Sequence, residues 1–525
     1  MKRFTAILAR ITIPVFLLLI FIPFIWSLPG VHGINLSRFE DMEKRAPNEY
    51  PALPSDRQEL AAFPGAFEKA FNDHFGFRRD LITIFKLFKY NVFNQSTDPN
   101  NVVVGKDGWL YLGNDYFRTF DRHTGSRPPL EAEVDRLLTA EKKKRQWLAR
   151  RGIKYLFAAA PNKYSIYPEY LPAYVRSADN TVLLDLVAEK ARKEGLPFID
   201  LRPFLKEAKE LHGTLAYAKT DSHWSNLGAF YGYKALVEKL SEQTGPLKTL
   251  SLNGFEQSIG KAYNLEGLLG MRKFHKLKDV KIRLDFDHSS PEMKACEFSG
   301  KKIGWDQYNE VHYNSMLFID NEQALNRLSI FMLRDSFTNR LSPLLNQTFT
   351  RMAYTHYNRP ELPGNIVDFL LTFKPQVLLH EMVEVNLAGV TGVYPPWETP
   401  AVTPQEAALL WPELGPSLSE CRLENKSNAD EWNVTVPATD TRTVLLRINL
   451  KAASDATLMA GSSSLAISKG TGTYYVEMTP GTKKRLTFKG KSGAVNILTV
   501  AARPMSEEAL RKLYRPEPFS GSHKQ

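Results

Sequence analysis

Hydrophobic and polar positions along the 525-residue chain change their pattern twice. Between residues 130 and 395, apolar runs of strand length alternate with stretches of helical period, which predicts a doubly wound parallel α/β sheet. From Trp432 onward the apolar runs are short and are separated by Gly, Ser and Asp. That pattern is typical of an all-β sandwich or jelly roll. We therefore expect an α/β domain followed by a β-rich module.

The N-terminus carries a separate apolar signal. Ile11 to Leu28 contains no charged residue, and Lys2, Arg3 and Arg10 precede it. With the preceding turn, the segment approaches the ~30 Å thickness of a bilayer core. The flanking positive charges predict a cytoplasmic N-terminus, with the rest of the chain on the other side. A cleavable signal peptide is the alternative, but Trp26 to Gly33 makes a poor cleavage site, so an uncleaved transmembrane anchor is favoured.

These patterns predict a division of the whole chain. Strands are expected at Lys154–Ala160, Pro197–Leu201, Leu328–Leu333, Phe349–Tyr354 and Gln376–Leu379, with a helix from Leu130 to Arg151. The predicted segments are an anchor (1–30), a segment packing on the core (31–129), an α/β domain (130–395) with an insertion at about 245–325, a linker (396–430), a carbohydrate-binding-like β domain (431–505) and a loose tail (506–525).

Charge and composition narrow the possible partners. The formal net charge is +11, which suits nucleic acid, an anionic membrane surface or a polyanionic saccharide. No basic stripe interleaved with aromatic residues and no zinc-finger or P-loop spacing is present, so no nucleic-acid partner is expected. Cys296 and Cys421 are the only cysteines and allow at most one disulfide. His and Cys residues do not cluster in a way that would suggest a metal site, and no cofactor is expected.

The most informative polar residues follow the predicted strand at Leu328–Leu333. This apolar run ends abruptly in Arg334, Asp335 and Ser336. In open α/β sheets the chemistry lies at the carboxyl ends of the strands, which is where a nucleophilic Ser336 would be placed. Locally the same residues also suit a helix cap.

A second polar stretch supplies the partners that a nucleophilic serine needs. Serine requires a base within hydrogen-bonding distance, and the base requires a group that fixes its tautomer. Asp221 and His223 lie in a loop predicted to follow a strand and precede a helix capped at Ser225 or Asn226. In an extended loop, residues two apart point the same way, so Asp221 can accept from the imidazole. We therefore predict a catalytic Ser336–His223–Asp221 triad.

Four motifs carry a family resemblance. Asp221-x-His223-Trp224 and Asp335-Ser336-Phe337, together with Asp73–Arg78 and Gly105–Leu110, resemble the SGNH-hydrolase-like (DHHW) superfamily and its alginate O-acetyltransferase (AlgJ/AlgX-like) branch. The resemblance implies a circularly permuted SGNH sheet, in which the end of Gln376–Glu384 corresponds to a junction with the start of Lys154–Ala160.

The chain departs from the family pattern near the serine. Arg334 replaces the usual Gly, and the Gly-x-Asn-Asp block is absent. Its place holds His380 to Asn386, where Glu381 and Glu384 are expected to be structural. Asn386 or Tyr357 is the candidate to complete an oxyanion hole, and Arg334 is added as a candidate substrate-binding residue.

The resemblance also implies a function. The implied function is O-acetylation of an alginate-like exopolysaccharide through an acetylated Ser336, with a membrane-bound O-acyltransferase as the partner that donates acetyl groups. It implies a single-pass protein of the bacterial inner membrane with its catalytic part in the periplasm. The basic strand near Lys483–Lys491 suits either an acidic polysaccharide or a solvated face. A glycan acetylesterase and a non-catalytic polysaccharide-binding export component remain alternative functions.

Overall fold

The computed structural model describes residues 12–18, 21–22, 46–75, 78–175, 180–270, 277–288, 293–297, 316–359, 362–389, 396–398, 401–419, 421–425, 430–460, 463–491 and 493–516. The predicted anchor over residues 1–30 lies mostly outside these ranges. Among the residues that are described, no helix combines the length and the apolar character needed to span a bilayer.

A seven-stranded mixed sheet organises the described part of the central domain. Five neighbouring strands are parallel, as the alternating pattern predicted, and two antiparallel strands extend one edge. The order across the sheet is β4 (Phe198–Asp200), β3 (Lys154–Ala160), β11 (Val377–Val383), β9 (Asn326–Arg334), β10 (Phe349–His356), β8 (Leu317–Asp320) and β7 (Lys294–Glu297).

The strand order tests the predicted circular permutation. Strands β11 and β3 are parallel neighbours, with Val377 opposite Lys154 and Val383 opposite Ala160. The last strand of the domain therefore lies beside its first long strand. This adjacency is what the permuted SGNH arrangement requires, because the junction then falls between neighbouring strands.

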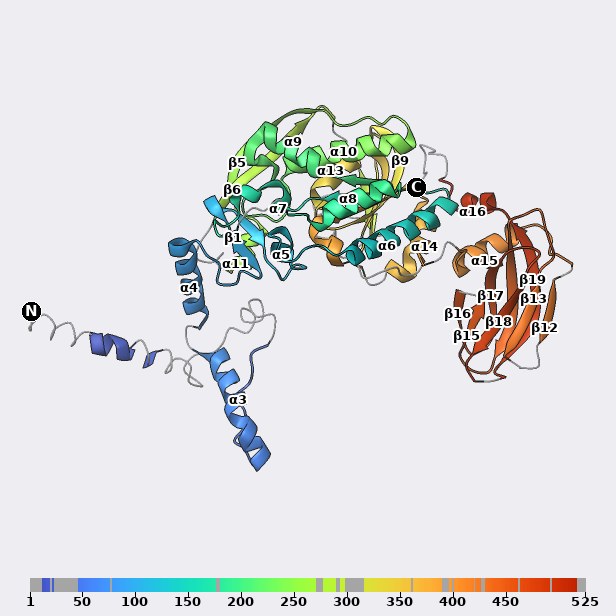
Figure 1. Ribbon diagram of the computed structural model, residues 1–525, viewed down its shortest axis with the longest axis horizontal. Helices are drawn as coiled ribbons and strands as arrows, with labels where there is room; N and C mark the ends of the chain where they lie inside the picture. The colour runs from blue at the N-terminus through green and yellow to red at the C-terminus, as the bar shows by residue number, and fades with distance from the viewer. Residues whose placement is uncertain are drawn as a thin grey trace, which may run out of the picture.

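The central strands are mostly apolar because both of their faces are covered. On β9, Ile330 and Met332 enter one core cluster, whereas Phe331 and Leu333 enter the other. A parallel strand buried on both faces loses the polar alternation of a half-exposed strand. One face is covered by α6 (Glu131–Arg150), α8 (Leu183–Lys193) and α14 (Leu362–Phe373), and the other by α9 (Arg202–His212), α10 (Asn226–Thr244) and α13 (Thr338–Thr348) (Figure 1).

Shorter elements surround this sheet. The insertion forms an antiparallel hairpin of β5 (Leu252–Lys261) and β6 (Lys278–Phe286), with α11 (Asn264–Leu269) between the two strands. The N-terminal part contributes α3 (Arg57–His74), α4 (Arg78–Phe93), β1 (Val102–Val104), η1 (Lys106–Gly108), β2 (Leu110–Leu112) and α5 (Thr119–His123), and short helices follow at α7 (Lys163–Ile166), η2 (Pro168–Tyr170), η3 (Gly213–Ala216) and η4 (Glu384–Gly389).

The C-terminal module is a β-sandwich. Two sheets of the described residues enclose one apolar cluster that includes Leu446, Ile448 and Leu458. The first sheet consists of β12 (Arg422–Asn425), β13 (Glu431–Thr435), β18 (Lys483–Lys489), β15 (Ala456–Ala460) and β16 (Ser463–Ile467), and the second of β17 (Gly470–Met478), β14 (Thr443–Ala452) and β19 (Val495–Met505). Cys296 and Cys421 are both free thiols.

The structure corrects the expected linker and the expected loose tail. The linker region contains α15 (Pro404–Glu413), and the tail begins with α16 (Glu507–Leu513). Both helices pack on the α/β domain, where Leu410 and Leu510 join the same core cluster as Trp147 of α6. The two helices are only 10 and 7 residues long, so their packing depends on contacts with distant parts of the chain.

Candidate active site

Ser336 lies in the turn between β9 and α13, at the carboxyl end of a central strand. The residue at the N-cap of α13 is Phe337, and no side chain caps this helix. The alternative interpretation of Ser336 as a helix cap is therefore wrong. Its Oγ lies 2.8 Å from His223 Nε2, which is hydrogen-bonding distance for a nucleophile and its base.

His223 is oriented by Asp221 as the two-residue spacing predicted. Asp221 Oδ1 lies 2.8 Å from His223 Nδ1 and also accepts the backbone N–H of His223 at 3.1 Å. An imidazole that donates Nδ1–H to this carboxylate presents an unprotonated Nε2 to the serine. The side chain of Asp221 is 4% exposed and that of His223 23%, so the base is reachable whereas its orienting group is not.

The loop that carries these residues does not follow a strand directly, contrary to the prediction. Helix α9 and η3 separate it from β4. Two other contacts place it: Tyr217 and Trp224 form an isolated antiparallel bridge, and Trp224 Nε1 donates to Phe337 O at 3.0 Å. The tryptophan of the Asp-x-His-Trp motif thus fastens the base loop to the serine turn. Ser225 caps α10, as expected, by accepting from Gly228 N.

Arg340 completes the charge balance around Asp221. Its Nη2 donates to Asp221 Oδ2 at 2.6 Å. Burial alone would raise the pKa of Asp221, but the hydrogen bond from His223 and the charge of Arg340 hold that pKa well below its ordinary value. Sequence reasoning missed Arg340, although its position one helical turn after Ser336 was a usable signal.

Tyr357 and Asn386 both contact Asp335 in the structure. Tyr357 donates its hydroxyl proton to Asp335 Oδ2 at 3.1 Å, and Asn386 Nδ2 donates to that oxygen and to the Tyr357 hydroxyl at 3.3 and 2.6 Å. Burial raises the pKa of Tyr357, so its phenol stays protonated. The donors of both side chains are therefore engaged in this network, and neither is left for an oxyanion.

Arg334 and Glu381 support the serine turn from inside the domain. Arg334 is 1% exposed, and its Nη1 donates to Asp335 O and Asn339 Oδ1, both at 3.2 Å. Glu381 Oε2 accepts from Thr338 Oγ1 at 2.8 Å and from Asp335 N at 3.3 Å. Burial, reinforced by the charge of Asp335, raises the pKa of Glu381 well above its ordinary value.

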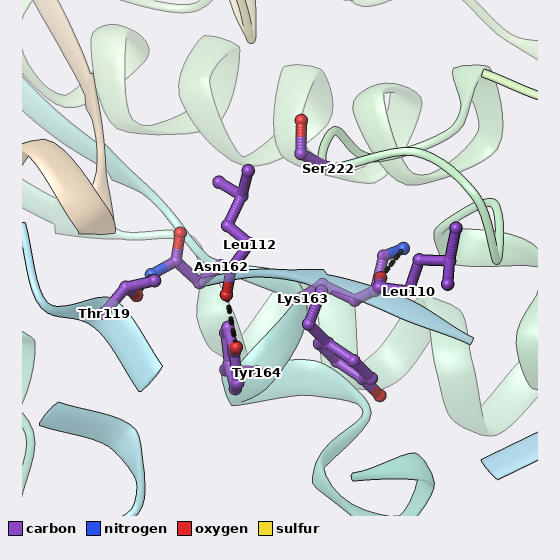
Figure 2. A pocket seen from close by; sticks show the side chains of 8 residues that line it. Leu110, Leu112, Thr119, Asn162, Lys163, Tyr164 and Ser222 are labelled. Atoms are coloured by element: carbon purple, nitrogen blue, oxygen red, sulfur yellow. Dashed lines mark hydrogen bonds between the residues drawn. The ribbon is translucent and has the colours of Figure 1, made fainter. Parts of the chain in front are cut away.

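A small hollow lies beside the base loop. Lys163 lines this hollow, and its Nζ donates to Leu110 O at 3.0 Å (Figure 2) and to Lys219 O at 2.9 Å. Burial lowers the pKa of Lys163 to about 7. One of the residues that line the hollow, Ser222, directly precedes His223 in the sequence. The lining residues are Leu110, Tyr111, Leu112, Thr119, Asn162, Lys163, Tyr164 and Ser222.

The triad residues define the chemistry that this site can perform. In the part of the chain covered by the structure, no group of three or more His, Cys, Asp or Glu side chains is arranged to hold a metal ion. The arrangement at Ser336 is that of a serine nucleophile, a histidine base and a buried carboxylate. It is suited to forming and resolving an ester on the serine.

Comparison with known proteins finds a family model that matches part of the site. Residues 102–282 match the family model described as the SGNH hydrolase-like domain of acetyltransferase AlgX. This match confirms the resemblance inferred from the motifs and includes the loop with Asp221 and His223. Ser336 lies beyond the matched segment.

Individual relatives show the same similarity. The chain is 30% identical over 164 residues to a probable alginate O-acetylase AlgJ of Pseudomonas aeruginosa, a match that covers 31% of this chain and 39% of the relative. Among solved structures, it is similar to PatB1 of Bacillus cereus (17% identity, TM-score 0.40, 55% of this chain and 96% of that one). It is also similar to the O-acetyltransferase domain of Pseudomonas putida AlgJ (20%, 0.35, 55% and 92%).

Proposed function

We propose that this chain, whose residues 102–282 match the SGNH hydrolase-like domain of acetyltransferase AlgX, is an O-acetyltransferase that modifies the hydroxyl groups of an exopolysaccharide. The observation that carries the proposal is the 2.8 Å distance between Ser336 Oγ and His223 Nε2, with Asp221 fixing the imidazole. The AlgJ relative supports acetyl as the transferred group.

The reaction proceeds in two balanced steps. In the first, His223 Nε2 takes the Ser336 proton while Oγ attacks the acetyl carbonyl, and the departing alcohol of the donor receives that proton. In the second, His223 takes a proton from a sugar hydroxyl, which attacks the acetyl-serine. The ester bond then passes to the sugar, and Ser336 Oγ recovers a proton from the imidazolium.

Negative charge develops on the acetyl carbonyl oxygen in both steps. Tyr357 and Asn386 have their donors engaged at Asp335, and Phe337 N donates to Asp335 Oδ1 at 3.0 Å. We assign the oxyanion contact to the backbone N–H of Ser336 at the turn. A single well-placed donor typically contributes ~2.7–4 kcal/mol to transition-state stabilisation.

The proposal also covers the polysaccharide acceptor, the acetyl donor and the cellular location. A formal charge of +11 and a basic strand β18 favour an acidic, alginate-like polysaccharide as acceptor. A membrane-bound O-acyltransferase supplies acetyl groups, and an N-terminal anchor in the bacterial inner membrane leaves the catalytic part in the periplasm. The apolar, charge-free run from Ile11 to Leu28 supports this location.

The proposal is tested with the purified full chain, 4-nitrophenyl acetate and acidic oligosaccharides. We expect acetylated oligosaccharide by mass spectrometry and an acetyl group on the Ser336 peptide in the absence of acceptor. Ser336→Ala should lower turnover roughly a thousandfold or more. Ser241→Ala is the matched control, because this α10 hydroxyl donates only to Val237 O.

Other outcomes of the same assay identify the rival functions. Free acetate without acetylated sugar would identify an acetylesterase, since water and sugar compete for the same acetyl-serine. Neither product, with retained saccharide binding, would identify an export component that lacks catalysis. Full activity of Ser336→Ala would overturn the mechanism.

A further inference from the structure

Helix α4 exposes an apolar stripe along its length. Leu81, Ile84, Phe85, Phe88 and Val92 are between 46% and 61% exposed. At ~100° per residue these five positions fall within an arc of roughly 100°, so they form one continuous face. Single exposed apolar residues are common on protein surfaces, but a contiguous stripe marks an interaction site.

The opposite face of α4 is already occupied. Thr83 is buried, and Leu87 and Tyr90 pack against the apolar cluster formed by β1, β2 and α11. The helix is thus held on the body by one side, and the stripe faces outward. Figure 1 shows α4 at the N-terminal end of the molecule, opposite the β-sandwich.

The composition of α4 indicates the chemistry of the missing partner. Its sequence contains four basic residues, including Lys86 and Lys89, and one acidic residue, Asp80. A helix with an aromatic and aliphatic face and basic flanking residues is typical of helices that lie in the plane of an anionic membrane surface. A second copy of the helix would bring like charges together, whereas anionic headgroups complement them.

We propose that α4 is an interfacial helix that docks the catalytic domain on a bilayer containing anionic phospholipid, with Ile84, Phe85 and Phe88 inserted among the acyl chains. The inference is independent of the chemistry at Ser336. It gives the protein a second membrane contact besides the proposed anchor, and thereby a fixed orientation of the catalytic domain at the membrane surface.

The test uses the full chain in nanodiscs of phosphatidylcholine with phosphatidylglycerol, and spin labels at single cysteines after Cys296→Ser and Cys421→Ser. One label replaces Phe88. The matched control replaces Leu211 of α9, which is also apolar and is 62% exposed. We expect the label at position 88 to collide with dissolved oxygen in preference to a water-soluble nickel chelate, and the label at position 211 to show the reverse. High salt or phosphatidylcholine alone should reduce the difference.

Three results would overturn the proposal. The label at 88 remaining as accessible to the nickel chelate as the label at 211 would exclude membrane contact. Protection that appears in lipid-free detergent and grows with protein concentration would identify a second copy as the partner. Protection that appears only after another membrane protein is added would identify a protein partner. Ile84→Glu should abolish the protection of position 88 if the lipid contact is correct.

Discussion

At the scale of single residues, the site depends on an ion pair that holds the carboxylate of Asp221 in place. Asp221 is bonded on one oxygen by His223 and on the other by Arg340. The two bonds keep the carboxylate ionised and fix its plane against the imidazole. Within the described part of the chain, the Arg340 side chain makes no hydrogen bond to Ser336 or His223, so its expected role is to position Asp221.

Arg340→Gln tests this positioning role. Without the guanidinium, the pKa of Asp221 rises and its charge attracts the imidazolium proton more strongly, so a higher pH is needed to free the base. We expect kcat/KM with a soluble acetyl ester to fall about tenfold near neutral pH, ~1.4 kcal/mol, and the acid limb of its pH profile to move upward. The profile is measured from pH ~5 to ~9.

The control for Arg340→Gln is Arg351→Gln. Arg351 pairs with Asp320 at 3.1 Å near the start of β10, away from the carboxyl end of the sheet. It should leave the pH profile unchanged. A uniform loss of activity in Arg340→Gln without movement of the acid limb would show that the arginine serves the fold alone.

At the scale of secondary-structure elements, one buried cluster joins three helices. Arg151, at the end of α6, donates through Nε and Nη2 to both oxygens of Glu406 of α15, at 2.5 Å each. Tyr514, after α16, donates to Glu406 Oε1 at 2.6 Å. The charged side chains of Arg151 and Glu406 are 0% exposed, so removing one would leave the other charge buried without a partner and would destabilise the fold.

Glu406→Ala should therefore destabilise the protein by ~3–5 kcal/mol, because it leaves the Arg151 guanidinium buried without its carboxylate. The measurement is the urea midpoint followed by tryptophan fluorescence, since Trp147 lies against Arg151. Glu413→Ala, on the exposed side of the same helix, is the control and should change stability by less than ~0.5 kcal/mol. Equal midpoints for both variants would contradict this account.

At the scale of the whole molecule, the β-sandwich is attached to the α/β domain by the helices that precede and follow it in the chain. Helix α15 precedes its strands and α16 follows them, and both helices pack on the α/β domain (Figure 1). Arg150 of α6 also pairs with Glu477 of β17 at 2.8 Å. The sandwich is therefore attached to the α/β domain through a shared core.

Lys489→Glu with Lys491→Glu tests whether this module contributes to polysaccharide binding. Both lysines are exposed, and the double substitution lowers the formal net charge by 4. We expect weaker, less salt-dependent binding to a polyuronate and unchanged turnover of a small acetyl ester, because the triad is not altered. Binding is measured by calorimetry at two salt concentrations.

A charge-matched control separates a local effect from net charge. Lys206→Glu with Lys234→Glu makes the same change on exposed positions of α9 and α10. If this control weakens polyuronate binding as much as the Lys489 and Lys491 variant does, the β-sandwich has no specific role and overall charge accounts for the affinity.

The sequence by itself determined the periodic elements and the triad. Buried parallel strands and amphipathic helices leave their period in the chain. Ser336 stands out where an apolar strand ends, and Asp221 and His223 stand out by their two-residue spacing in a polar loop. Only the tertiary structure decided which partners these residues take. Arg340 at Asp221, the engaged donors of Tyr357 and Asn386, and the packing of α15 and α16 all depend on contacts between segments far apart in the chain. Local sequence does not encode such contacts, because they form only when folding brings distant segments of the chain together.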